Sequence, residues 1–271
     1  MLEHLQLPPG QAGAAWFYTG NRPDCPRHRH REIECNLVIS GRARYLLPQR
    51  SIDLQPASTV WLFPGQEHLL VDRQADFRMW IVVWSPALVA RLCDGPQGLA
   101  PSLLSADPPG DWFRRLGQGS VDRLARLCEE VAALDGQGPV TDAGLAWLLV
   151  RLWQATADAS VLAAGDPAHP AVRKALYLLT GRQPPGDLVT LAAACGLSAD
   201  RLGRLFQRDT GITISCYRNR LRCERACQLM TDSDDDLTAI ALEAGFGSYS
   251  HFHRVFTSQL GLPPGRWRRR S

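Results

Sequence analysis

The sequence predicts an α+β multidomain protein, in which an N-terminal β-barrel with a helical hairpin precedes an all-helical C-terminal domain. Three observations lead to this fold class. The chain has 271 residues, of which 45% are hydrophobic and 21% charged, and this composition suits two globular cores. Short apolar runs separated by turn residues give way to helical periodicity near residue 119. The last third of the chain contains an internal repeat.

Residues 14–86 have the pattern of a strand-rich domain. Short apolar runs, such as residues 37–39 and 79–84, are separated by proline and glycine. Strands at such short intervals predict a small sandwich or barrel. Residues 87–118 are rich in glycine and proline and predict little beyond one short helix. We place this domain at residues 1–118.

Residues 119–165 predict a helical hairpin. Apolar residues recur at spacings of three and four over residues 121–134 and again over 141–159, and a turn containing glycine and proline separates the two segments. Two roles remain open for this hairpin. It either covers the β-domain or forms the seam of a homodimer.

The C-terminal domain is expected to span residues 166–271. Residues 165–170 read Gly-Asp-Pro-Ala-His-Pro and interrupt both earlier patterns. Pro170 is suited to open a helix over residues 171–180, because its φ angle is already helical and the first helical turn does not need its missing N–H.

The charge of the chain is concentrated in this last domain. The formal net charge is only +3, from 30 basic and 27 acidic residues, which excludes a histone-like protein with a uniformly basic surface. Residues 187–271 hold 12 arginines and 9 acidic residues, whereas the charges of residues 1–186 cancel. The whole positive excess therefore lies in the last third of the chain, where it is expected to face an anionic partner.

The internal repeat consists of two helical pairs. Residues 191–197 align with 240–246 at an offset of 49, and residues 202–212 align with 252–262 at an offset of 50. In each copy a short helix ends at a glycine, Gly196 or Gly245, and a serine three or fewer residues later, Ser198 or Ser248, is suited to cap a second helix. This pattern predicts helix-turn-helix units at about 188–208 and 237–259.

A long helix is expected between the two units. Residues 213–230 have helical periodicity, and a helix of about 18 residues is about 27 Å long. Such a spacer could place two recognition helices in successive major grooves of DNA, which lie about 34 Å apart. Asp232 or Ser233 in the acidic segment 231–236 is expected to cap the next helix.

The C-terminal residues resemble the AraC/XylS family of bacterial transcription regulators. The most specific segments are Ile240-Ala-Leu-Glu-Ala-Gly-Phe246, Phe252-His-Arg-Val-Phe256 and Gly261-Leu-Pro-Pro264. The chain departs from the family pattern at Trp267, where tyrosine is usual, and at Cys223, where an aliphatic residue is usual.

The resemblance implies which side chains face DNA. The residues of the first recognition helix would be Ala199, Asp200, Gly203 and Arg204, and those of the second Tyr249, Ser250, His251, His253 and Arg254. Arg204 and Arg254 are expected to be the main direct contacts, because a guanidinium can bind guanine or phosphate through two hydrogen bonds.

The N-terminal domain carries a second motif. His28-x-His30-x-x-x-Glu34 is followed by Pro64-Gly65-x-x-His68, a pattern that resembles the two motifs of the cupin barrel. That resemblance implies that these four residues converge on a divalent metal or line an effector pocket without metal. In the other interpretation, His28 and His30 belong to an exposed arginine-rich strand, and only Glu34 and His68 reach the pocket.

Together these features predict a DNA-binding transcription regulator, controlled by a small-molecule effector in the cupin-like domain, and no enzyme. The expected partners are promoter DNA, the effector, a second copy of the chain and, for an activator, RNA polymerase. The alternatives are a metal-dependent cupin enzyme with a helical interaction tail, and a DNA-binding protein that has lost its effector. The sequence contains no run of about 18 apolar residues and no secretory signal, so we expect a cytoplasmic protein without membrane contact.

Overall fold

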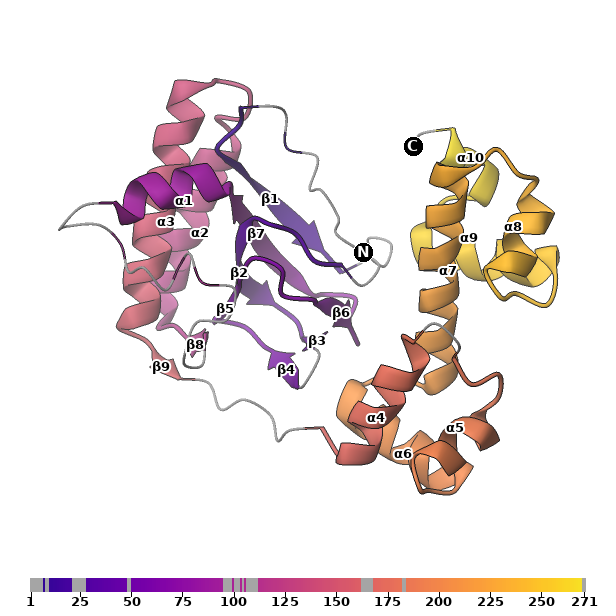
Figure 1. Ribbon diagram of the computed structural model, residues 1–271. Coiled ribbons are helices and arrows are strands. Elements are labelled where there is room, and N and C mark those ends of the chain that lie inside the picture. The colour runs from indigo at the N-terminus through magenta and orange to yellow at the C-terminus, as the bar shows by residue number, and fades with distance from the viewer. Residues whose placement is uncertain are drawn as a thin grey trace.

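The computed structural model describes residues 7, 10–20, 28–47, 50–94, 99, 103, 105, 112–161, 168–181 and 184–269. The chain divides into a sheet-rich N-terminal domain and a helical C-terminal domain, as the sequence predicts (Figure 1). The predicted boundary at residue 165 lies outside the described residues. Among the described residues, no helix is long and apolar enough to cross a lipid bilayer.

The N-terminal strands form two sheets. The strands are β1 Gly13–Thr19, β2 Ile33–Ser40, β3 Ala43–Leu46, β4 Ser51–Leu54, β5 Ser58–Leu62, β6 Leu69–Val71, β7 Arg78–Trp84, β8 Phe113–Arg115 and β9 Ser160–Val161. The larger sheet has the order β1-β7-β2-β5-β8-β9, and the smaller has the order β4-β3-β6. The strand pattern predicted a sandwich or a barrel, and a closed barrel requires every edge strand to be paired on both sides. In the described part of the chain β1 and β9 each have one neighbour in their sheet, so the two sheets form an open, sandwich-like barrel.

The helical hairpin covers the larger sheet. Its helices are α2 Gln118–Ala132 and α3 Pro139–Ala157, and the short α1 Pro86–Cys93 precedes them. The buried faces of α2 and α3 share one hydrophobic cluster with β2, β5 and β7. Trp84 donates from its indole N–H to the Leu145 carbonyl at 2.8 Å, and Trp61 donates to the Thr156 hydroxyl at 2.9 Å. The hairpin therefore has the core-covering role that the sequence left open.

The C-terminal domain contains the two predicted helix-turn-helix units. Its helices are α4 Pro170–Leu179, α5 Leu188–Ala194, α6 Ala199–Thr210, α7 Ile214–Asp232, α8 Leu237–Glu243, α9 Tyr249–Leu260 and α10 Pro264–Arg268. The pair α5 and α6 repeats as α8 and α9 with the offsets read from the sequence. In Figure 1, α7 runs from the group formed by α4, α5 and α6 to the group formed by α8, α9 and α10.

Local backbone chemistry explains the turns of these units. Gly196 and Gly245 adopt φ angles of 73° and 91°, a left-handed conformation that costs glycine little. Ser198 and Ser248 cap α6 and α9 by accepting hydrogen bonds from backbone N–H groups. The expected cap of α8 was wrong. Because α7 continues through Asp232, the cap shifts to Asp236, whose carboxylate accepts from the Thr238 N–H at 2.7 Å.

The first helix-turn-helix unit is docked on the smaller sheet. Leu46 of β3 and Leu69 and Val71 of β6 share a hydrophobic cluster with α4, α6 and α7. The Arg220 guanidinium of α7 donates to the Leu70 carbonyl at 3.2 Å, and Arg44 donates to a backbone carbonyl at the end of α6. The smaller sheet of the N-terminal domain and the first helix-turn-helix unit therefore share one hydrophobic core.

Candidate functional site

Helices α6 and α9 each have one buried and one exposed face. Leu202 and Phe206 of α6 are fully buried, and so are Phe252 and Phe256 of α9. These anchors recur every four residues, which commits one stripe of each helix to the core and leaves the opposite stripe in solvent. These four aromatic and aliphatic side chains are therefore core residues.

The exposed face of α6 carries an ion pair. The Arg204 guanidinium lies 2.9 Å from the Asp200 carboxylate, and both side chains are 74% exposed. Ala199 and Gly203 are half-buried and add no polar side chain to this face. Sequence reasoning missed Arg201, which is exposed on the same helix and could have been found from its position one residue before the buried Leu202.

The face of α9 combines polar and aromatic groups. Ser250 and Arg254 are exposed, whereas Tyr249, His251 and His253 are half-buried. The ring centroids of Tyr249 and His253 lie 6.0 Å apart, and the His251 ring lies 5.6 Å from that of Phe246. The three rings therefore help to fix the shape of the second unit, and Arg254 projects as its exposed cation.

The spacer α7 is anchored on both units. Its 19 residues correspond to about 28 Å of helix. The ring of Tyr217 lies 5.7 Å from that of Phe206 in the first unit. Cys223 is buried in the core of the second unit, so its departure from the family pattern is accommodated as a packing residue. A helix held at both ends fixes the distance between α6 and α9.

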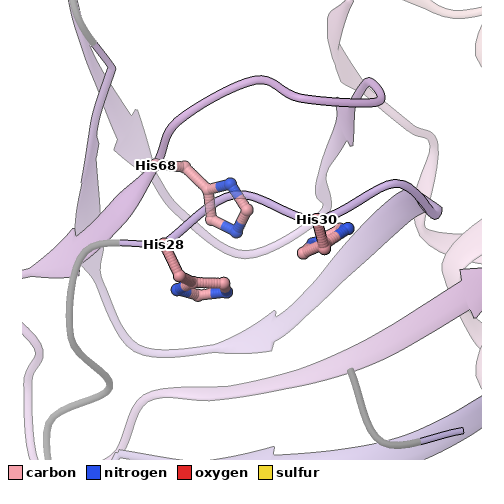
Figure 2. A group of neighbouring side chains, drawn as sticks. All are labelled: His28, His30 and His68. Atoms are coloured by element: carbon pink, nitrogen blue, oxygen red, sulfur yellow. The ribbon is translucent and has the colours of Figure 1, made fainter. Parts of the chain in front are cut away.

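Three histidines of the N-terminal domain converge at one place. His28 and His68 form an antiparallel bridge, with backbone N–H to carbonyl distances of 3.2 and 3.0 Å. Figure 2 shows the rings of His28, His30 and His68 gathered in one space, the first two from one segment and the third from the segment that leads into β6. Their ligand nitrogens lie within 4.8 Å of one another.

Glu34 joins this cluster through His30. The Glu34 carboxylate is 3.1 Å from His30 Nε2 and accepts a hydrogen bond of 2.8 Å from the Asn36 amide. Burial would raise the pKa of Glu34, but these hydrogen bonds and the nearby histidines hold it at about 2. Burial also opposes the charged form of His30, yet Glu34 and the Glu32 carbonyl outweigh that effect and raise the His30 pKa.

His68 is buried and neutral. Burial lowers its pKa to about 4, so its ring is uncharged at pH 7. Its Nδ1 lies 3.0 Å from the Gln66 carbonyl, and a carbonyl can only accept, so Nδ1 carries the proton. The Nε2 atom of His68 is then a lone-pair acceptor, and it has no hydrogen-bond partner among the described residues.

The exposed-strand interpretation of this segment is wrong for His30. His30 is only 2% exposed, because its side chain alternates with the exposed Arg29 and Arg31 and so points inward. Sequence reasoning missed two partners of the cluster. Asn36 lies two residues after Glu34 on the same face of β2, and the Tyr45 ring lies 5.8 Å from that of His68.

Comparisons with known proteins agree with both halves of the chain. Residues 9–164 match the AraC-like ligand binding domain, and residues 191–270 match a helix-turn-helix domain. The chain is 36% identical to the HTH-type transcriptional activator RhaS of Klebsiella pneumoniae, over 88% of this chain and 86% of that protein. It is 26% identical to the activator RhaR of Klebsiella pneumoniae subsp. pneumoniae, over 90% and 87%. The solved structure of ToxT from Vibrio cholerae covers 95% of this chain and 98% of its own, at 15% identity and a TM-score of 0.38.

Proposed function

Because this chain belongs to the AraC family of transcription regulators, we propose that α6 and α9 read a promoter and that an effector at the histidine cluster controls this reading. The single observation that carries the proposal is the structural repeat. It presents Arg204 and Arg254 at equivalent positions of two helices, and α7 holds these helices at a fixed separation. This arrangement suits two consecutive major grooves on one face of DNA.

The two units differ in what they can recognise. Arg254 is suited to bind the O6 and N7 atoms of a guanine, and Ser250 is suited to a neighbouring base or phosphate. On α6, Arg204 must break its ion pair with Asp200 before it can bind DNA. The side chains at Ala199 and Gly203 cannot form hydrogen bonds. We therefore expect the second unit to contribute more base selectivity and the first to contribute more phosphate contact.

The outer surface of the hairpin supports a homodimer. Trp147 and Val140 lie seven residues apart on α3, hence on the same face, and are 54% and 53% exposed. A groove of about 450 Å³ lies between α2 and α3 and is lined by Arg123, Arg151 and neighbouring residues. A second copy would cover this apolar surface, and an activating dimer would present a surface to RNA polymerase.

The competing hypothesis is a metal-dependent enzyme with a helical interaction tail. Both Klebsiella relatives are transcriptional activators, and each aligns with nearly the full length of this chain. This similarity favours the hypothesis of a transcription regulator. The exposed arginines of α6 and α9 also have no use in an enzyme that acts at the histidine cluster.

The direct test is Arg254→Ala. We expect its affinity for an operator, selected by the protein from random-sequence DNA, to fall by about 5- to 150-fold, the range that one two-pronged arginine–guanine contact supports. Affinity for unrelated DNA should fall much less, because that binding depends mainly on phosphates. Gel-shift titration at fixed salt measures both affinities.

The matched control for this experiment is Arg91→Ala. Arg91 is exposed on α1, far along the chain from the reading helices and outside the α2–α3 groove, so its loss removes the same charge without removing the contact. Equal binding by Arg254→Ala and Arg91→Ala, with both variants folded, would overturn the assignment of α9 as a reading helix.

A further inference from the structure

We propose that His28, His30 and His68 bind a divalent transition-metal ion, and that this ion is the effector to which the DNA-binding domain responds through β6. The first claim, that the three histidines bind an ion, depends only on the geometry of the cluster. The second claim, that this ion regulates DNA binding, rests on the proposed function.

The backbone contacts of two imidazoles resemble those of metal ligands. In His30 and His68 the Nδ1 atoms lie 3.0 Å from the carbonyls of Glu32 and Gln66, respectively. Metal-binding histidines usually use one ring nitrogen in this way, which fixes the ring and directs the other nitrogen at the ion. The Nε2 atom of His68 has no partner among the described residues, whereas that of His30 lies 3.1 Å from the Glu34 carboxylate and would exchange this contact for the ion.

The unpartnered Nε2 atom of His68 is suited to bind an ion. A buried polar atom without a partner destabilises the folded state, and most buried polar atoms of native proteins are therefore paired. The His68 side chain is 2% exposed, and its Nε2 has no partner among the described residues. An ion at the centre of the cluster would satisfy this atom.

The size of the cluster fits a transition metal. Nitrogen ligands at about 2.0–2.1 Å from a tetrahedral ion lie about 3.3 Å from one another. The nitrogens of the cluster lie within 4.8 Å, so modest rotations of the rings would close it. Imidazole suits Zn²⁺, Ni²⁺, Cu²⁺ and Fe²⁺ better than Mg²⁺ or Ca²⁺. The Glu34 carboxylate beside His30 would offset the charge of the ion.

The strand β6 connects this cluster to the DNA-binding domain. His68 directly precedes β6, in which alternate side chains face opposite directions. Leu70 lies in the core of the sandwich, whereas Leu69 and Val71 lie in the cluster shared with α4 and α7. The Leu70 carbonyl also accepts the hydrogen bond from Arg220. A shift of His68 toward an ion would therefore move the strand on which the first reading unit is docked.

The domain contact leaves room for such a shift. A cavity of about 200 Å³ lies between β3, β6 and the helices α4 and α7, with Leu46, Leu69, Tyr177 and Tyr217 in its lining. Glu67, which directly precedes His68, also lines this cavity. A contact that is not fully packed can adopt a second arrangement at a smaller energetic cost than a close-packed one.

The first claim is tested by titrating the metal-free full-length protein with Zn²⁺ by calorimetry and with Co²⁺ by visible absorption. The wild type should bind one ion per chain, and bound Co²⁺ should show the absorption of a nitrogen-coordinated site. His68→Gln should bind at least about 100-fold more weakly. His169→Asn, which removes a histidine outside the cluster and keeps a capping side chain at the start of α4, should bind as the wild type does.

Thermal melting shows whether each variant is folded and gives an independent measure of binding, because an ion that binds only the folded state raises its melting temperature. Zn²⁺ should raise the melting temperature of the wild type and of His169→Asn, but not that of His68→Gln. No bound ion in the wild type, or equal binding by His68→Gln, would overturn the proposed site.

The second claim is tested by gel shifts with operator DNA selected from a random library. Zn²⁺ should change the operator affinity of the wild type by at least about 5-fold, the lower end of typical coupling between sites. Arg220→Met should still bind Zn²⁺ but lose this response, because it lacks the hydrogen bond to β6. An unchanged response in Arg220→Met, or none in the wild type, would overturn the route through β6. The proposed reading of DNA would still stand if Arg254→Ala lost operator affinity.

Discussion

At the scale of single residues, the Asp200–Arg204 pair gives the first prediction. Both side chains are exposed, so the pair contributes little to folding. Asp200→Ala should release Arg204 and remove a negative charge from the proposed DNA-facing surface, and we expect operator affinity to rise by a few fold. Gel shifts at low salt measure the effect most clearly. A loss of affinity would instead show that Asp200 itself contacts a base.

The sequence predicted the candidate side chains but not their partners. Arg204 and Arg254 were found from the repeat, and both are exposed on their helices. The ion pair of Arg204 with Asp200 and the contact of Asn36 with Glu34 were not predicted. Such contacts depend on side-chain rotamers and on the packing of neighbouring segments, which sequence periodicity does not specify.

At the scale of secondary-structure elements, helices were predicted well and the sheet less well. The α7 helix and both helix-turn-helix units follow from periodicity and capping, because those signals are local in sequence. The choice between a sandwich and a barrel stayed open in the sequence, because the pairing of edge strands such as β1 and β9 depends on residues far apart in the chain. The cap of α8 shifted for a local reason, since α7 extends into the acidic segment.

Alanine substitutions at Gly196 and Gly211 distinguish the cost of local backbone strain from the cost of disturbing the contact between the domains. Gly196 and Gly211 have similar φ angles, 73° and 78°, so alanine at either position should cost about 1–2 kcal/mol of unfolding free energy. A Cβ atom at Gly196 would meet nothing within 4 Å, whereas one at Gly211 would lie 2.9 Å from the Cβ of Asp72 in the N-terminal domain. Gly211→Ala should therefore lose about 1–3 kcal/mol more.

Urea denaturation of the two variants measures this difference. The double variant Gly211→Ala with Asp72→Gly removes the facing side chain, so it should recover the additional loss. Asp72 itself has a φ angle of 52°, which glycine adopts readily. Equal losses in Gly196→Ala and Gly211→Ala would mean that the contact between Gly211 and Asp72 contributes nothing to stability.

At the scale of the whole molecule, the structure adds the docking of the first reading unit on the smaller sheet. Leu69 and Val71 read in the sequence as ordinary strand residues, and only the fold shows that they pack against α4 and α7. Arg220 likewise reads as one cation of a basic helix, yet it is 7% exposed and bonded to β6. Contacts between domains leave little local signal, because they require shape complementarity rather than periodicity.

The reading of DNA by two helices at a fixed separation is tested most directly by hydroxyl-radical footprinting on the selected operator. For each chain bound, we expect two protected patches on one face of the DNA, about 10–10.5 base pairs apart. Arg204→Ala should weaken protection of one patch, and Arg254→Ala should weaken the other. A single patch, or protection that neither arginine variant changes, would contradict reading by α6 and α9.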